Sequence, residues 1–305
     1  MIRYGIGEWF GHLFTSLSIA DRKQFGVIAQ KTTKAANQPC PFKRISGNPT
    51  ICNKRGGVCS FRLYECKNEK ISAVCSVEKA LVTMCPQRFL EGGLVHRWIG
   101  ETLLGSEDTK ILNEFKFLMV KGEAESEEDL QDEETKAVGR IDTVLVFETI
   151  DHLEWCPVEM QSVYFSGYSM TPEFKMLAES NEKLPLLLKA RRPDWRSSGP
   201  KRLMPQLQIK VPTLRRWGKK LALVVDKAFY DEFGEAPQAN DVSNADIIWF
   251  VVDYKASDNN AKLKQHSLRM TTLERSIESL VGGEPITKGD FERQIREKLN
   301  TSGHP

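Results

Sequence analysis

The 305-residue sequence lacks several features that would place a protein in a broad class at once. No apolar run reaches the ~20 residues that a membrane-spanning helix needs, and the opening stretch, interrupted by Glu8 and His12, is not a secretory signal. No internal repeat is present. The net charge is only +2, which argues against a generic polycation but leaves room for a local basic surface. We therefore expect a cytoplasmic protein with no membrane partner.

Cysteine is scarce outside one stretch, because six of the seven cysteines fall between Cys40 and Cys85. In a chain without an export signal, such clustering favours metal binding over disulfides. Residues 36–90 also show little periodicity, so a bound metal ion is the usual way to hold such a segment folded. Four thiolates would form a closed tetrahedral structural site for zinc or a single iron. The pattern suggests the ligands Cys40, Cys52, Cys59 and Cys85, with Cys66 or Cys75 as a possible replacement for one of them, and with buried unligated cysteines as the alternative.

Apolar periodicity divides the chain into three regions. Residues 1–35 are predicted to be largely helical, because Trp9, Phe10, Leu13, Phe14 and Leu17 recur at helical spacing. Residues 36–90 form the cysteine-rich module, and residues 91–305 form a larger α/β domain. Within that domain we expect an acidic solvated loop and a series of regular elements. The loop is 122–134, and the elements are a helix after 91, strands near 115–120, 142–147, 156–163, 221–225 and 247–252, and a charged helix from about 268.

Two of the predicted strands carry carboxylates at positions that suit a metal-dependent reaction. Asp142 opens an apolar strand, and the next strand alternates so that Glu159 and Gln161 share one side, where Asp142 can join them. Hydrolysis of a phosphodiester needs carboxylates to hold Mg²⁺ and a polar group to place the attacking water. Glu114 precedes another predicted strand and could add a third oxygen ligand. The spacing alone also fits ordinary surface or ion-paired residues.

Residues 186–220 form a strongly basic segment, with eleven lysines and arginines against a single acid, Asp194. Such a segment supplies the positive charge that a phosphate backbone requires, and arginine is the commonest reader of guanine edges. The alternative is a solvated basic face. The candidate DNA contacts are Arg191, Arg192, Arg215 and Arg216.

These blocks together resemble the NotI-like type II restriction endonucleases, a branch of the PD-(D/E)XK nucleases. The blocks follow the order of the family as far as about residue 225. They are Glu8–His12, Cys40–Phe42, Gly57–Cys59, Cys85–Arg88, Asp142–Leu145 and Val158–Tyr168. The resemblance implies an α/β fold with a PD-(D/E)XK nuclease core, a mixed central sheet flanked by helices, and an inserted four-cysteine module that holds one iron ion.

Carried over position by position, the resemblance assigns roles to individual residues. Asp142, Glu159 and Gln161 fall on the catalytic motif, and Glu114 falls on the upstream acidic position. Cys40, Cys52, Cys59 and Cys85 fall on the ligands of the structural metal. Two positions depart from the broader superfamily, Ile141 in place of proline and Gln161 in place of lysine, although the NotI-like branch also carries glutamine. A neutral glutamine cannot supply positive charge, so the metal must carry more of the charge stabilisation.

The sequence therefore predicts a type II restriction endonuclease, an Mg²⁺-dependent enzyme that hydrolyses double-stranded DNA at specific sites. Residues 91–305 would form its catalytic domain, including the basic segment. Because palindromic DNA is matched by two-fold protein symmetry, the enzyme is expected to act as a homodimer. The main alternative is a non-catalytic DNA-binding protein with a structural four-cysteine metal site. A lesser one is a nuclease that acts in repair or on modified DNA.

Overall fold

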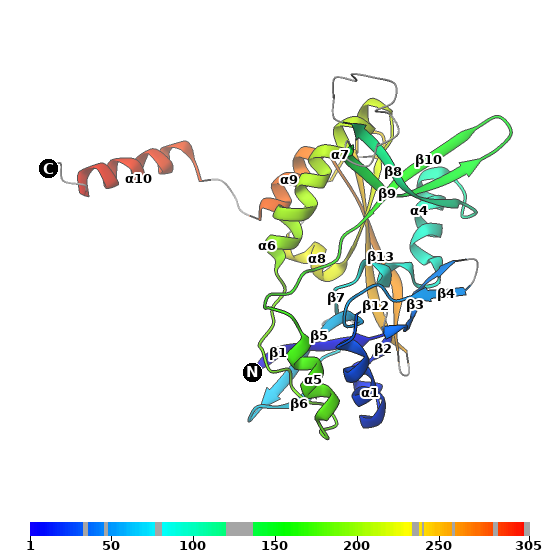
Figure 1. The fold of residues 1–305 in the computed structure, drawn as a ribbon. Helices are drawn as coiled ribbons and strands as arrows, with labels where there is room; N and C mark the ends of the chain where they lie inside the picture. The colour runs from blue at the N-terminus through cyan, green and yellow to red at the C-terminus, as the bar shows by residue number, and fades with distance from the viewer. Residues whose placement is uncertain are drawn as a thin grey trace, which may run out of the picture.

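The protein is a mixed α/β molecule built on a six-stranded central sheet, as seen in a computed structural model (Figure 1). The structure describes residues 1–32, 36–45, 48–76, 81–119, 137–233, 238–239, 241–257, 260–282 and 286–301. The sheet has the strand order β13-β12-β11-β10-β9-β8. The strands are β8 (Lys110–Met119), β9 (Ala137–Glu148), β10 (Leu153–Met160), β11 (Leu221–Asp226), β12 (Ile247–Ser257) and β13 (Asn260–Thr271).

The centre of this sheet consists of the parallel strands β10, β11 and β12, and the outer strands β8, β9 and β13 run antiparallel to their neighbours. Every residue of β11 is buried, because helices cover both faces of the sheet. All five strands expected from the sequence are present. The predicted C-terminal helix begins later than expected, because β13 continues to Thr271 along β12.

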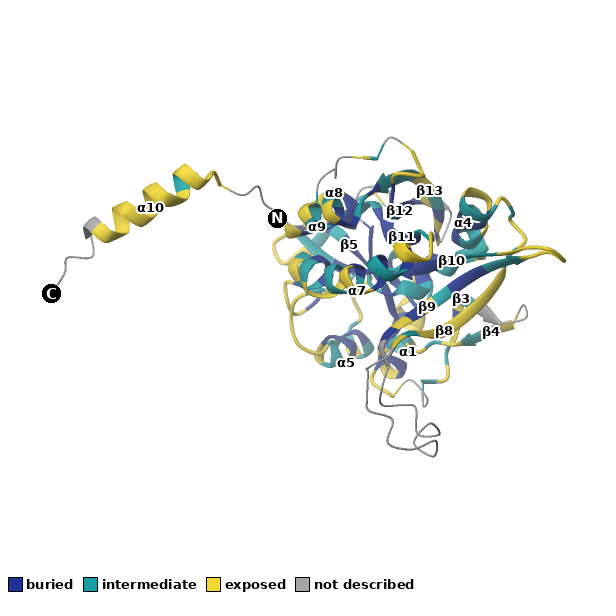
Figure 2. Ribbon diagram, turned by 90° about the horizontal axis from the view of Figure 1, so that it is seen from above, coloured by how far each residue is buried: buried dark blue, intermediate teal, exposed yellow. Residues whose placement is uncertain are grey.

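Helices cover the two faces of the sheet. On one face lies α4 (Leu94–Leu104), and on the other lie α7 (Met204–Arg216), α8 (Lys227–Glu232) and α9 (Leu273–Val281) (Figure 1). A short α6 (Trp195–Ser198) and the π-helical turn η5 (Gly199–Leu203) lead into α7. Helix α7 buries Leu207, Val211 and Leu214, which recur every three or four residues and so form one apolar stripe. Figure 2 shows the buried core concentrated in β10, β11 and β12.

Helix α4 carries a half-buried histidine, His96, between the core residues Val95 and Ile99. Its Nε2 atom has no hydrogen-bond partner among the described residues, and burial lowers the pKa of the imidazole to about 4. In the unfolded chain the histidine pKa is ~6.5, so the unfolded state binds this proton more tightly. Stability from His96 is therefore complete above pH ~6.5 and is lost as the pH falls from there towards the folded-state pKa.

We expect this residue to contribute about 2 kcal/mol of acid destabilisation between pH 7.5 and pH 5. Urea unfolding of His96→Leu at the two pH values should show a free-energy difference smaller than that of the wild type by this amount. His152→Leu is the matched control, since His152 is 74% exposed. An unchanged difference for His96→Leu would show that His96 does not titrate as described.

The N-terminal segment corrects one prediction. Residues 1–35 were expected to be largely helical, but the first half forms β1 (Ile2–Trp9), β2 (His12–Leu13) and the 3₁₀ turn η1 (Phe14–Ser16). The helical prediction holds only for α1 (Ile19–Ala29), and residues 33–35 lie outside the described residues. The apolar spacing arises instead from a tight turn, in which Phe10 and Gly11 adopt φ values of 47° and 85°. The turn brings both ends of the hairpin onto one aromatic cluster, and long-range strand pairing overrides the local pattern.

The cysteine-rich segment shares a sheet with this hairpin. Strand β5 (Val58–Lys67) pairs with β1 on one side and with β6 (Lys70–Val74) and β7 (Leu81–Thr83) as further partners. The remaining elements are the hairpin β3 (Pro39–Ile45) and β4 (Asn48–Ile51), the 3₁₀ segment η2 (Pro86–Gly93), and α5 (Thr171–Glu179), which packs on α1. Residues 1–32 and the cysteine-rich segment therefore fold together around one apolar cluster.

The predicted acidic loop at 122–134 lies outside the described residues. Helix α10 (Lys288–Thr301) stands away from the rest of the chain and, apart from the half-buried Asp290, is exposed along the part whose burial is described (Figures 1 and 2). Among the described helices, none combines the length and the apolar character that crossing a membrane requires.

Candidate active site

Three acidic residues lie at one level of three adjacent strands. Thr143 of β9 pairs with Val158 of β10, which places Asp142 opposite Glu159. On the other side of β9, the pairs Asn113↔Thr143 and Phe115↔Ile141 place Glu114 opposite Asp142. Residues directly opposite on antiparallel strands project to the same face. The order Glu114, Asp142, Glu159 thus crosses the sheet from the edge strand β8 inwards.

The three carboxylates differ sharply in exposure. Glu114 and Asp142 are exposed, whereas Glu159 is only 4% exposed. Glu114 has a positive φ of 63° and its carboxylate lies 3.6 Å from the Arg140 guanidinium. Alternation along β9 and β10 places Asp142 and Glu159 on the face of Val144 and Trp155, which packs against α7. The pair therefore combines a solvent-facing carboxylate with a buried one.

The buried carboxylate of Glu159 contacts an ammonium from α7. Lys210 Nζ donates a hydrogen bond to Glu159 Oε2 and another, of 3.0 Å, to Gln206 Oε1. Burial raises the pKa of Glu159 above its usual value, Lys210 opposes this increase, and the Asp142 carboxylate adds to it. In the sequence, Lys210 is one of the eleven cations of the basic segment. Its position on the buried stripe of α7, between Leu207 and Val211, is the signal that distinguishes it from the other lysines there.

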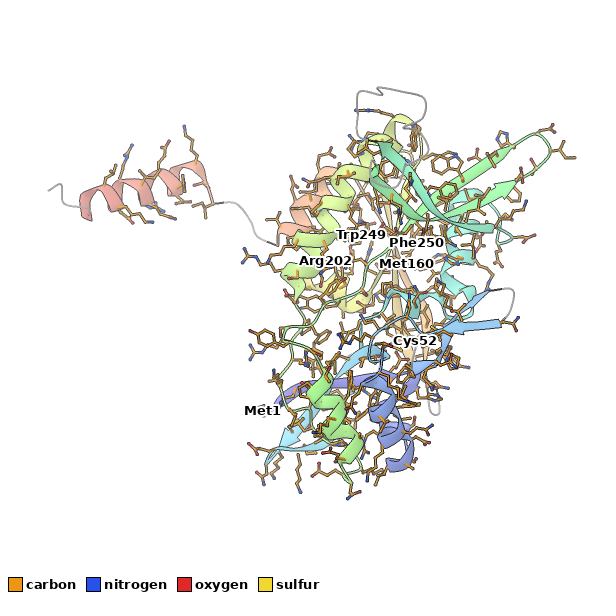
Figure 3. The ribbon with its side chains drawn as sticks, viewed as in Figure 1. Met1, Cys52, Met160, Arg202, Trp249 and Phe250 are labelled. Carbon is orange, nitrogen blue, oxygen red and sulfur yellow. The ribbon has the colours of Figure 1, made fainter. Side chains whose placement is uncertain are left out.

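Gln161 follows β10 directly and extends its pairing with β11, because its backbone N–H donates to the Val224 carbonyl at 2.9 Å. The side chain is buried, and its Nε2 atom donates to the Ser162 carbonyl at 2.6 Å. Figure 3 labels Met160, between Glu159 and Gln161, in the middle of the central sheet. The amide is thus held at the carboxyl end of the strand that carries Glu159.

The four cysteines proposed as ligands lie near one another. Burial raises the pKa of the Cys52 thiol, with Cys40 adding to the increase, and burial likewise raises the pKa of Cys85, with Cys52 and Cys40 contributing. Burial raises the pKa of Cys59 well above its usual value, with Glu8 and Cys85 as further causes. Cys40, Cys59 and Phe42 form a small buried cluster against which Cys52 packs. Within the described ranges, however, no group of three or more His, Cys, Asp or Glu side chains is arranged to hold a metal ion.

The cysteine-rich segment is joined to the end of β10 through the Met84 carbonyl. Ser162 Oγ donates to this oxygen at 3.2 Å, and Lys54 Nζ donates to it at 3.0 Å. The Met84 N–H in turn donates to the Cys59 carbonyl at 2.9 Å. Figure 3 shows Cys52 below the central sheet, on the N-terminal side of the molecule. One residue beyond Gln161, at Ser162, the chain is therefore fixed to Met84, which directly precedes Cys85.

The four candidate arginines of the basic segment lie in different surroundings. Arg191 is buried, and its guanidinium contacts Glu173 at 2.8 Å and the carbonyls of the loop at 166–169. Arg215 is exposed but contacts Asp246 and Glu274. Arg192 and Arg216 are exposed. Of the four arginines, Arg192, Arg215 and Arg216 are thus exposed to solvent, and Arg191 is not.

Residues 23–265 match the protein family described as restriction endonuclease NotI. The chain belongs to the NotI restriction endonuclease family. No curated protein matches the chain. Membership of the NotI family implies a site-specific endonuclease that acts on double-stranded DNA. The matched range includes the row of carboxylates, all four candidate cysteine ligands and the basic segment, and it excludes α9 and α10.

Proposed function

We propose that the chain is an Mg²⁺-dependent type II restriction endonuclease with a PD-(D/E)XK core, whose catalytic residues are Asp142, Glu159 and Gln161. The observation that supports this most directly is the placement of Asp142 opposite Glu159 on adjacent strands, with one carboxylate exposed and the other buried. A buried glutamate is costly unless a cation lies beside it, so this position suits a site that handles positive charge. Glu114, next in the same row, is proposed as an auxiliary acidic residue.

The donor set fits a hard divalent cation, because carboxylate oxygens are the ligands that Mg²⁺ prefers. When bound, Mg²⁺ would stabilise the charge that develops on the phosphate. Asp142 and Glu159 would hold the ion from two strands that the ladder keeps in register. Gln161 would orient water or a phosphate oxygen through its amide. Because its Nε2 atom is bonded to the Ser162 carbonyl, the amide is fixed in direction before DNA binds.

We further propose that Cys40, Cys52, Cys59 and Cys85 hold one structural iron or zinc ion. The support for this is that Cys52 packs against the buried Cys40 and Cys59, since neighbouring thiolates repel one another until a cation neutralises them. The ion would hold the segment whose Met84 carbonyl binds the end of β10. Elemental analysis of the purified wild type and of Cys85→Ser tests this, with about one iron or zinc per chain expected only in the wild type.

For DNA contact we propose the basic segment, with the exposed Arg192 and Arg216 as the first candidates and with the ion-paired Arg215 and the buried Arg191 as further candidates. Lys54 and Arg55 of the cysteine-rich segment line a pocket of about 290 Å³ together with Tyr168 and Arg191, which adds positive charge from a second part of the chain. Cleavage of both strands at a palindrome would require a homodimer. Such an enzyme would act in the cytoplasm as part of a restriction–modification system.

The proposal is tested by incubating the purified protein with genome-sized DNA, with Mg²⁺ and with excess chelator in parallel. Discrete fragments that appear only with Mg²⁺, and whose sequenced ends share one motif, are the expected result. Tight DNA binding without cleavage in any sequence context would instead support a non-catalytic DNA-binding protein, in which Glu159 serves only to pair with Lys210. Cleavage confined to methylated DNA would support an enzyme specific for modified DNA.

A further inference from the structure

The charged residue Lys210 occupies a core position of α7. Its neighbours on the same helical face, Leu207, Val211 and Leu214, are at most 1% exposed, and Lys210 itself is 5% exposed. Burying an ammonium is costly unless it is paired and hydrogen-bonded. A leucine at this position would complete the apolar stripe at no such cost. The charge at position 210 therefore has a use that packing alone does not explain.

The partners of Lys210 indicate what that use is. The ammonium contacts Glu159 Oε2, and Gln206, one turn earlier on α7, accepts a second hydrogen bond at 3.0 Å. Asp142 lies opposite Glu159 on the adjacent strand β9, because Thr143 pairs with Val158. A single fixed ammonium thus faces the point where two carboxylates of the proposed catalytic site converge.

The residue that follows Glu159 by two positions is neutral. Gln161 presents an amide, which donates hydrogen bonds but carries no charge to offset the negative charge that builds up during phosphate hydrolysis. A lysine side chain from the facing helix reaches the same carboxylate from the other side. Glu159 therefore lies close in sequence to the neutral Gln161 and in contact with the buried ammonium of Lys210.

We propose that Lys210 supplies the protein's own cation in the catalytic site, acting through Glu159 in place of a charged residue at position 161. This inference rests on the proposed nuclease function. Lys210 holds the Glu159 carboxylate in place before a divalent cation binds. It then shares that carboxylate with the cation, and its positive charge remains beside the reacting phosphate.

The inference predicts two effects of Lys210→Met that run in opposite directions. Cleavage in a single turnover at saturating Mg²⁺ should slow about 100-fold, which is the cost of losing one electrostatic contact of this kind. Binding of Mn²⁺ to the free protein at pH 8, followed by electron paramagnetic resonance, should become severalfold tighter, because an ammonium no longer competes for Glu159 Oε2. Lys210→Arg, which retains the charge, should cleave faster than Lys210→Met.

A matched control is Lys227→Met, which removes a lysine paired with Asp231 on the surface of α8, outside the basic segment. It should leave Mn²⁺ binding and cleavage unchanged. Should Lys210→Met fail to fold, as judged by its circular dichroism, Lys210→Gln takes its place, because glutamine keeps a donor for Glu159 and removes only the charge.

The outcomes separate the possibilities. Weaker Mn²⁺ binding together with slower cleavage would overturn the inference, since a purely structural lysine would disturb both in the same direction. Cleavage at the wild-type rate in a folded variant would overturn it as well. If the wild type cleaves no DNA, the nuclease proposal fails, yet tighter Mn²⁺ binding in Lys210→Met would still support competition between Lys210 and a cation at Glu159.

Discussion

Asp142→Asn is expected to slow cleavage at least about 1000-fold, which corresponds to ~4 kcal/mol of transition-state stabilisation. Asparagine keeps the size of aspartate but offers no anionic oxygen, so the divalent cation loses one of its two proposed carboxylate ligands. Because Asp142 is exposed, its replacement leaves no unpaired charge in the core and the fold should be retained. Single-turnover rates at saturating Mg²⁺, together with thermal melting of both proteins, measure the effect.

The natural control is Asp151→Asn, in the exposed connection between β9 and β10, which removes the same charge from the same hairpin. It should cleave at the wild-type rate. Measuring DNA binding in Ca²⁺ distinguishes an effect on binding from an effect on cleavage. Loss of a metal ligand is expected to lower the cleavage rate of DNA that is already bound. An Asp142→Asn enzyme that cleaves at the wild-type rate would remove Asp142 from the catalytic site.

Arg88→Met is expected to lower the free energy of unfolding by about 3–5 kcal/mol, the usual cost of leaving a buried charge without its partner. Arg88 is fully buried, and its Nε atom donates to Glu8 Oε2 at 2.9 Å. Burial lowers the pKa of Arg88, but Glu8, Tyr254 and Glu91 together more than offset this and raise the pKa of Arg88 above its usual value. The same guanidinium donates to Glu91 at 2.8 Å and to the Ala261 carbonyl at 2.6 Å.

Arg88 also contacts residues outside this ion pair, in both the cysteine-rich segment and the central sheet. The side chain follows Cys85 by three residues and lies 4.4 Å from the Phe42 ring and 4.9 Å from the Tyr254 ring. It therefore joins the cysteine-rich segment to the edge of the central sheet. In Arg88→Met, the hydrogen bond from Ser60 is the one that Glu8 would retain among the side-chain contacts of the described residues.

Urea unfolding measures the loss of unfolding free energy in Arg88→Met. Two further variants provide the values with which this loss is compared. Lys110→Met removes an exposed ion pair with Glu148 and should cost no more than ~1 kcal/mol. The double variant Glu8→Leu/Arg88→Met removes both charges and should recover much of the stability. A loss below ~1 kcal/mol in Arg88→Met would mean that water or rearrangement compensates Glu8, and that Arg88 does not join the two parts of the molecule.

Local patterns were enough to predict five of the six strands of the central sheet, all except β13. The apolar runs at 221–225 and 247–252 form β11 and β12, because a strand buried on both faces must be apolar throughout. The alternation around Glu159 also predicted that its side chain projects from the face of β10 that does not carry Val158 and Met160. The two apolar clusters, one on each face of the sheet, agree with this. A strict period of two leaves little freedom in the direction of a side chain.

Long-range contacts account for what the sequence could not predict. The spacing of Trp9, Phe10 and Phe14 fits a helix, yet pairing of β1 with β5, some fifty residues later, turns the same residues into a hairpin. Arg191 was grouped with the exposed arginines by composition, but Glu173 and the loop at 166–169 enclose it. Charge composition counts residues without regard to their partners, and partners depend on the fold.

The candidate site shows the same division. The sequence alone predicts Asp142, Glu159 and Gln161 as candidate site residues, because each belongs to a local strand pattern. Their register, and the arrival of Lys210 beside Glu159, depend on how β9, β10 and α7 pack. Strand pattern is a property of neighbours in sequence. An ion pair between residues 51 positions apart exists only after a helix has docked on the sheet, when burial makes each charge require the other.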